Sequence, residues 1–180
     1  MDPLGEHALT CGRSKGLVQS RHNEVVYAVR QCLTDAGWGG EISGGPALEG
    51  HQTRPADVWA LAGQAIDVTI VRTASRPPGK AAEAAEAAKR KKYSHDLERA
   101  PGMGFAPFAL DLQGGIGPSA WREMQSWATA TALREEEACD RGQALQRILA
   151  RVANAFVIGI TRQIRSFEID QRRPSRGQAR

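Results

Sequence analysis

Cysteine, aromatic residues and long apolar runs are all scarce in this chain of 180 residues. Its three cysteines, Cys11, Cys32 and Cys139, are odd in number and unevenly spaced, which argues against a secreted disulfide scaffold and favours a reducing compartment. The longest apolar stretch, ANAFVIGI, is far shorter than a membrane span. The first ten residues carry acids where a signal peptide needs positive charge. We therefore expect an intracellular protein without a membrane partner.

Positive charge is concentrated at one end of the chain. The formal net charge is +4, and residues 162–180 hold six arginines against Glu168 and Asp170, which accounts for the whole excess. Such a basic end favours a polyanionic partner, and it is also typical of a solubilising terminus without ordered structure. The sequence leaves both interpretations open.

The first part of the chain predicts one helix and three strands. From Ser20, valines recur at helical spacing until several glycines end the pattern, and Ser20 is placed as the helix cap. A short strand is expected near Glu41 and Ile42. Two further strands, at about 57–62 and 65–71, are separated by a link short enough for an antiparallel hairpin.

The second part of the chain predicts three helices and one strand. The run AAEAAEAAKRKKYSHDLER has very high helix propensity, GFAPFALDL indicates a buried strand, and GGIGP indicates a turn. A helix beginning at Ser119 follows. The last helix carries an apolar stripe, typical of a core face or a partner-helix face, formed by Leu145, Leu149, Val152, Phe156, Ile160 and Ile164. The whole order favours one α/β (α+β) domain with a small mixed sheet flanked by helices.

Two aspartates interrupt the apolar hairpin RPADVWALAGQAIDVTIV. Asp57 follows Pro55 at the start of one predicted strand, and Asp67 lies inside the next. Acids at comparable heights on neighbouring strands can bind one hard cation, and Mg²⁺ needs only one or two carboxylates beside water and phosphate oxygens. The alternative is that Asp57 caps a turn while Asp67 lies on the wet face of an edge strand. Spacing alone does not separate these interpretations.

The hairpin, together with the upstream RHN and the downstream KRKKY, resembles the PD-(D/E)xK, or restriction-endonuclease-like, domain found at the C-terminus of non-LTR retrotransposon reverse transcriptase proteins. The resemblance implies that Asp57 and Asp67 are the two acids of that motif. The residue two positions after the second acid is normally lysine in the family, and here it is Thr69. Some members take the basic group from the following helix, which implies Lys89 here.

The same resemblance implies further site residues. It makes Asp57, Asp67 and Lys89 the catalytic group and adds Glu24 as an extra metal ligand, although a surface helix position is the alternative for Glu24. The RHN stretch is expected to contact phosphate or to cap the helix, and KRKK to contact DNA or remain solvated. The predicted nucleic-acid contacts are Arg21, His22, Asn23, Arg54, Lys92 and Tyr93.

The first residues resemble the second half of a zinc knuckle, with His7 and Cys11 as its last two ligands. A structural zinc site needs four ligands, so no zinc binding is expected. We therefore divide the chain into a knuckle-like remnant at 1–19, an endonuclease-like domain at 20–165 and a basic, disordered tail at 166–180.

Three functions follow from these patterns. The first is a DNA endonuclease that depends on Mg²⁺ or Mn²⁺ and nicks target DNA, in the nucleus if the target is genomic. The second is an inactive remnant of the same fold that binds nucleic acid or protein. The third is an interaction domain that self-associates through the stripe containing Leu149, Phe156 and Ile160 of the C-terminal helix.

Overall fold

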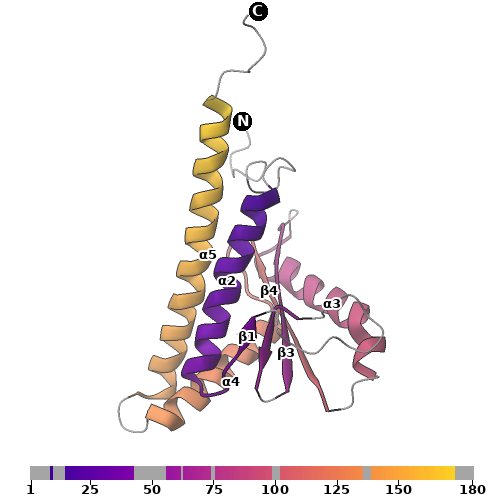
Figure 1. Ribbon diagram of the computed structural model, residues 1–180, viewed down its shortest axis with the longest axis vertical. Coiled ribbons are helices and arrows are strands. Elements are labelled where there is room, and N and C mark those ends of the chain that lie inside the picture. The colour runs from indigo at the N-terminus through magenta and orange to yellow at the C-terminus, as the bar shows by residue number, and fades with distance from the viewer. Residues whose placement is uncertain are drawn as a thin grey trace, which may run out of the picture.

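The computed structural model describes Leu9 and residues 15–42, 56–61, 63–73, 76–98, 102–135 and 139–172. Within these residues the chain forms a four-stranded mixed sheet and four helices, which confirms the predicted α+β class (Figure 1). The elements are α2 Lys15–Asp35, β1 Glu41–Ile42, β2 Val58–Ala60, β3 Gln64–Val71, α3 Lys80–Glu98, β4 Gly104–Asp111, α4 Pro118–Glu135 and α5 Arg141–Arg172.

The sheet has the strand order β1-β2-β3-β4. The first three strands are antiparallel, as predicted for the hairpin, and Gly63 makes the turn between β2 and β3 with a positive φ of 79°. β4 is parallel to β3, and α3 forms the crossover between them. β3 is therefore paired along its whole length on the β4 side but only at its first residues on the β2 side.

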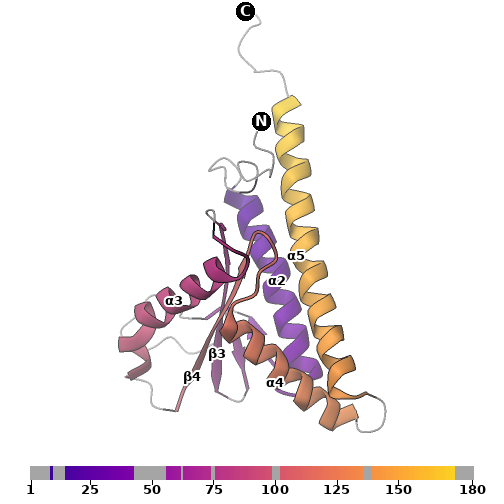
Figure 2. The same ribbon diagram turned by 180° about the vertical axis from the view of Figure 1, so that it is seen from behind.

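The alternation of side chains along the strands gives the sheet two different faces. Ile66, Val68 and Phe108 belong to the main core with α2, α4 and α5. Ala65 packs in a smaller cluster on the opposite face, which α3 covers. Figures 1 and 2 show α3 on one side of the sheet, while α2 and α5 lie on the other. Asp67, two positions from Ala65, therefore points to the α3 side.

The main core contains a stacked aromatic pair between β4 and α4. The rings of Phe108 on β4 and Trp127 on α4 are nearly parallel, with centroids 5.7 Å apart, and both side chains are fully buried. Trp121, earlier in the same helix, is 38% exposed. The face of α4 that docks on the sheet therefore runs through Met124, Trp127 and Ala128.

Two helix boundaries differ from the expectations. α2 begins at Lys15, so Ser20 lies inside the helix and is not its cap. α5 continues to Arg172, so residues 166–172 are helical and the prediction of a disordered tail from residue 166 is wrong for this part. The knuckle-like residues His7 and Cys11 lie outside the described residues.

The length of α5 also bears on the expectation of no membrane partner. By length and composition alone, the stretch Arg141–Ile169 is apolar and long enough to cross a membrane, and 28% of its most apolar window is buried in the fold. The shorter run ANAFVIGI does not reveal this. The helix packs along α2 and against α4, as the core helix of a globular fold also does.

Candidate active site

Asp57 and Asp67 face each other across the β2–β3 pair. Val58 is the partner of Ile66 in this antiparallel ladder, so one further step along the register places Asp57 opposite Asp67. Directly opposite residues carry their side chains on the same face of a sheet. Asp67 is only 7% exposed, and the Asp57 side chain is 28% exposed. The two acids therefore occupy one site on the α3 face.

Lys89 enters this site from α3. Its Nζ lies 2.7 Å from Asp67 Oδ2, and its side chain is 27% exposed. Thr69, at the position where the resembled family has lysine, lies two residues beyond Asp67 on the same face of β3 and is partly buried. The structure thus places a lysine beside the second acid, from the helix rather than from the strand, as expected for Lys89.

Burial and charge act against each other at Asp67. Burial raises the pKa of this carboxyl, Lys89 lowers it, the negative charge of Asp57 raises it again, and the net pKa lies above its ordinary value. Apart from the Lys89 ammonium, no hydrogen-bond donor among the described residues reaches Asp67 Oδ2. Asp67 is therefore a buried carboxylate whose charge needs a nearby cation.

Asp57 and His22 together close the open edge of β3. The backbone N–H of Val68 donates to Asp57 Oδ2 at 2.8 Å, and His22 Nε2 lies 3.0 Å from the carbonyl oxygen of Val68. β2 begins only at Val58, so no strand supplies these bonds. Two side chains take the place of a strand there, so Asp57 has a structural role at the edge of β3, alongside any role in metal binding.

The hydrogen on His22 can be placed from its neighbours. Nε2 lies 3.3 Å from Asp57 Oδ2 and 3.0 Å from the Val68 oxygen, and both of these oxygens accept, so Nε2 carries the hydrogen. Burial lowers the pKa of His22, but the hydrogen bond and charge of Asp57, together with the bonds to Val68 and Asn23, outweigh burial and raise the pKa above its ordinary value. The ring is thus held against Asp57 in a fixed orientation.

Three of the predicted site residues lie elsewhere. Arg21 is 4% exposed and packs against Gly159 of α5, where a Cβ would lie 2.8 Å from Arg21 Cγ, so it is not available to phosphate. Glu24 pairs with Arg162 of α5 and does not join the two aspartates. Tyr93 is 5% exposed because its ring packs edge-on against Phe105, with centroids 5.4 Å apart.

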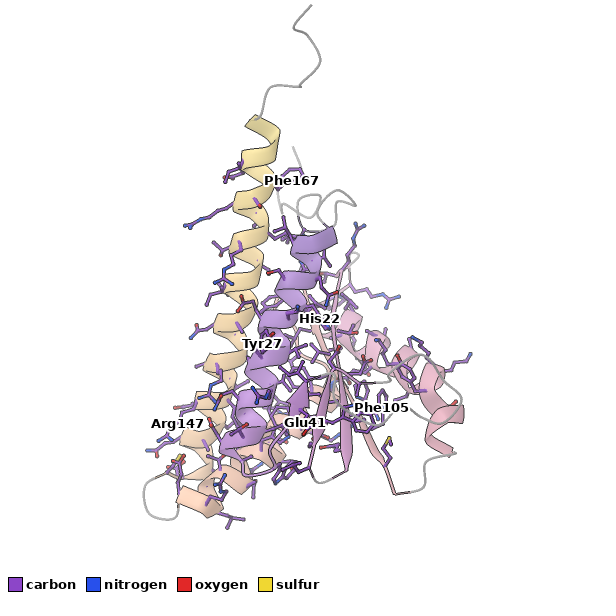
Figure 3. The ribbon with its side chains drawn as sticks, viewed as in Figure 1. His22, Tyr27, Glu41, Phe105, Arg147 and Phe167 are labelled. Carbon is purple, nitrogen blue, oxygen red and sulfur yellow. The ribbon has the colours of Figure 1, made fainter. Side chains whose placement is uncertain are left out.

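The early start of α2 explains the first of these corrections. RHN was expected near the helix N-terminus, where free backbone N–H groups bind phosphate. With the helix beginning at Lys15, RHN lies more than a turn inside it, so its side chains are distributed around the helix. Arg21 points to α5. His22 points to the edge of the sheet (Figure 3). Asn23 points to solvent, where it accepts a hydrogen bond from Gln19 at 2.9 Å.

The remaining predicted contacts are partly placed. Lys92 is exposed on α3, with its Nζ 4.7 Å from the centre of the Tyr93 ring and 3.1 Å from the Tyr93 hydroxyl. Arg54 lies outside the described residues. Glu86, on the same face of α3 as Lys89 and Tyr93, has a structural role: its buried carboxylate accepts from the backbone N–H groups of Ser119 and Ala120 at the start of α4.

The donor set fits a hard cation held by few protein ligands. In the part of the chain that the structure describes, no group of three or more His, Cys, Asp or Glu side chains is arranged to hold a metal ion. Among the described residues, the site therefore offers the two opposed carboxylates of Asp57 and Asp67. Mg²⁺ is commonly bound by one or two carboxylates that are completed by water and substrate phosphate, so this pair suits Mg²⁺ or Mn²⁺.

Comparison with known proteins leaves the family of this chain open. No protein-family model matches it, and no curated protein matches it significantly.

Proposed function

We propose that the chain is a metal-dependent DNA endonuclease domain of the restriction-endonuclease-like type. The observation that carries the proposal is the convergence of Asp57, just before β2, with Asp67 on β3 and Lys89 on α3, whose Nζ lies 2.7 Å from Asp67 Oδ2. Two acids that can hold a metal ion and a lysine that can stabilise developing charge, on one face of a mixed sheet, suit metal-assisted phosphodiester hydrolysis.

Each residue has a distinct role in this proposal. Asp57 and Asp67 hold the divalent cation, which, when bound, supplies Lewis-acid activation of water and neutralises charge on the phosphate. Lys89 orients a phosphate oxygen and stabilises the negative charge that develops on it. His22 does not touch the substrate; it holds Asp57 in position through the contact of its Nε2 with Asp57 Oδ2.

DNA is the substrate that the surroundings favour. Arg90, Lys91 and Lys92 follow Lys89 on α3, and all three are exposed. Cations beside the site contact phosphates without reading base sequence. In the retroelement setting that the sequence resembles, the product is a nick in target DNA. The tail arginines beyond residue 172 are outside the described residues.

Nicking of supercoiled plasmid in Mg²⁺ or Mn²⁺ tests the proposal. Asp57→Asn and Asp67→Asn should abolish nicking, and Lys89→Met should reduce it by about 10²-fold or more. Glu83→Gln is the matched control, because Glu83 is an exposed carboxylate on α3 that pairs only with Lys80 in the described structure. Nicking that survives both aspartate substitutions contradicts the proposal.

A second readout does not depend on turnover. A cation held by Asp57 and Asp67 stabilises the folded state by mass action, so Mn²⁺ should raise the melting temperature of the unmodified chain and of Glu83→Gln. The shift should disappear in the two aspartate variants. Equal shifts in all four proteins mean that the metal binds elsewhere.

The second candidate is a DNA-binding domain without turnover. It is favoured by Thr69 at the usual lysine position and by the ion pair of Lys89 with Asp67, which already neutralises the buried carboxylate. This function predicts binding to labelled duplex DNA with steep salt dependence, no nicking in either metal, and equal affinity for the unmodified chain and Asp67→Asn.

A further inference from the structure

The outer side of α5 carries two adjacent exposed apolar side chains. Val157 is 57% exposed and Ile158 is 44% exposed. They lie in the middle of the segment 152–161, which contains no ionisable residue. α5 lies at the outer edge of the fold in both Figure 1 and Figure 2, with α2 on its inner side. Large exposed apolar neighbours without charge mark an interaction surface.

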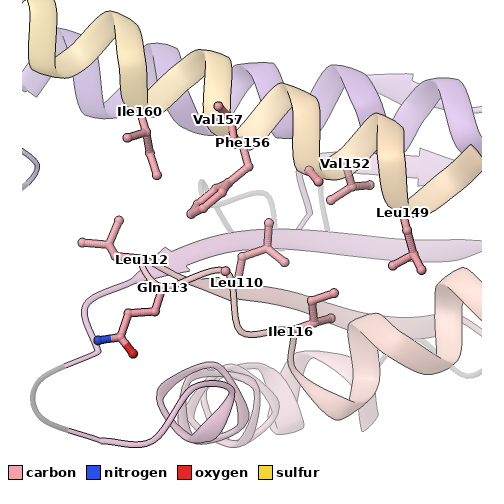
Figure 4. Close-up of a pocket in the computed structure, with 11 residues that line it drawn as sticks. Leu110, Leu112, Gln113, Ile116, Leu149, Val152, Phe156, Val157 and Ile160 are labelled. Atoms are coloured by element: carbon pink, nitrogen blue, oxygen red, sulfur yellow. The ribbon is translucent and has the colours of Figure 1, made fainter. Parts of the chain in front are cut away.

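The apolar stripe expected to mediate self-association is not this surface. Phe156 is 7% exposed and Val152 is 3% exposed, since both belong to the main core. Leu149 and Ile160 line a groove of about 440 Å³ between α5 and the loop after β4 (Figure 4). Val157 also lines this groove, so the outer face of α5 continues into it. A partner would meet Val157 and Ile158 first, and would meet the stripe containing Leu149, Phe156 and Ile160 only at its border.

The arginines of α5 that flank the charge-free segment are neutralised within the chain. Arg151 pairs with Asp35, and Arg162 pairs with Glu24, both on α2. Two positively charged copies can therefore approach along this segment without an unpaired cation from either of these positions. A nucleic acid finds no cation within residues 152–161.

Two of the charges farther out are complementary under a two-fold rotation, and a third, the exposed Arg165, lies opposite the small Ala150 of the second copy. Arg147 and Glu168 are both exposed, and each lies 10.5 residues from the midpoint between Val157 and Ile158, on opposite sides. A helix rises about 1.5 Å and turns about 100° per residue, so each of them lies about 16 Å along the helix from the midpoint. Around the helix axis, each lies about 30° from the direction midway between the Val157 and Ile158 side chains. All four side chains therefore share one helix face.

We propose that a second copy of this chain binds along the outer face of α5, antiparallel to it, with the two-fold axis between Val157 and Ile158. Val157 of one copy then lies against Ile158 of the other, and Arg147 of each copy lies beside Glu168 of the other. The contact is isologous, as in most two-fold dimers. The small residues Ala150 and Thr161 on the same face allow the helices to approach closely.

Sedimentation equilibrium of the full chain over a concentration series tests this dimer. The unmodified chain should dimerise, and Val157→Glu should weaken the dimer by about tenfold or more, because it places two like charges at the axis. Leu61→Glu is the matched control: Leu61 is 78% exposed in the turn between β2 and β3, not on α5, and its replacement should leave dimerisation unchanged. Circular dichroism checks that both variants are folded.

Charge reversal makes the test specific for the antiparallel register. Arg147→Glu and Glu168→Arg should each weaken the dimer, and the double variant should restore it, because the pair is re-formed with opposite polarity. Arg147 also lies 2.8 Å from Glu135 within its own chain. The variant Glu135→Gln is the control that measures how much the loss of this internal contact changes dimerisation. A chain that stays monomeric at all concentrations, a dimer unaffected by Val157→Glu, or a double variant as weak as the single ones overturns the proposal. Binding of the monomer to lipid vesicles through this face also overturns it.

Discussion

Lys89 Nζ lies 2.7 Å from Asp67 Oδ2, and this contact joins α3 to the middle of β3. The Asp67 side chain is almost completely buried, whereas the Lys89 side chain is partly exposed to solvent. The cation expected two residues after the second acid therefore comes from a separate element. Its position depends on the docking of α3 and not on the geometry of the strand.

The effects of substituting Lys89 and Asp67 on the free energy of unfolding should not be additive. Lys89→Met leaves the Asp67 carboxylate buried without its cation and should lower the free energy of unfolding by about 2 kcal/mol at neutral pH. Adding Asp67→Asn removes the buried charge and should recover most of that loss. Urea denaturation of the two single variants and the double variant measures the coupling. Strictly additive effects contradict a direct pair.

His22 should make stability depend on pH. Its folded pKa lies above the ordinary value of 6.5, so the folded state binds the proton more tightly than the unfolded chain does. This contribution is fully present below pH 6.5 and is lost as the pH rises through the folded pKa. Relative to His22→Gln, the unmodified chain should be most stabilised at the acid end of a urea series from about pH 5 to 8. A constant difference across the series refutes the assignment.

Glu86 should be a major determinant of stability. Its carboxylate accepts from the backbone N–H groups of Ser119 and Ala120 at 2.7 and 2.9 Å, and the residue is 3% exposed. Glu86→Ala leaves these buried donors without an acceptor and should cost about 3 kcal/mol of unfolding free energy. Glu83→Ala, on the exposed side of α3, should change it by less than about 0.5 kcal/mol. Similar losses in the two variants would show that Glu86 does not cap α4.

Cys32 should be chemically inert in the folded protein. Burial raises the pKa of its thiol to about 11, and the thiolate is the reactive form. A variant with Cys11→Ser and Cys139→Ser, which retains only Cys32, should react with a thiol reagent at pH 8 far more slowly in buffer than in urea. Equal rates in the two conditions contradict the burial of Cys32.

The sheet and α3 were predictable because local patterns and tertiary packing agree there. The pattern of apolar residues predicted β3 to within one residue at its start, and the run of Ala, Glu and Lys predicted α3. The inward face of α3 was also visible, since Glu86, Lys89 and Tyr93 are three and four residues apart and all point to the sheet side. The start of α2 was not predictable, because a serine such as Ser20 can cap a helix but can also lie inside one.

The contact of His22 with Asp57 could not be read from the sequence. It joins residues on α2 and at the start of β2, and it depends on β2 being short enough to leave the Val68 backbone uncovered. No local pattern records the length of a strand relative to its neighbour. The direction of Arg21 was hidden for a similar reason, because Gly159, which leaves room for it, is far away in the chain.

The bonds to the Val68 backbone affect how the history of such a site is interpreted. Asp57 and His22 replace a missing strand, so selection for folding alone preserves both residues. Under the proposed function, a descendant that had stopped cutting DNA would keep them and would still look like an active enzyme at these two positions. Within the part of the chain that the structure describes, Lys89 makes no comparable hydrogen bond to the backbone, so its loss would be the earlier sign of decay.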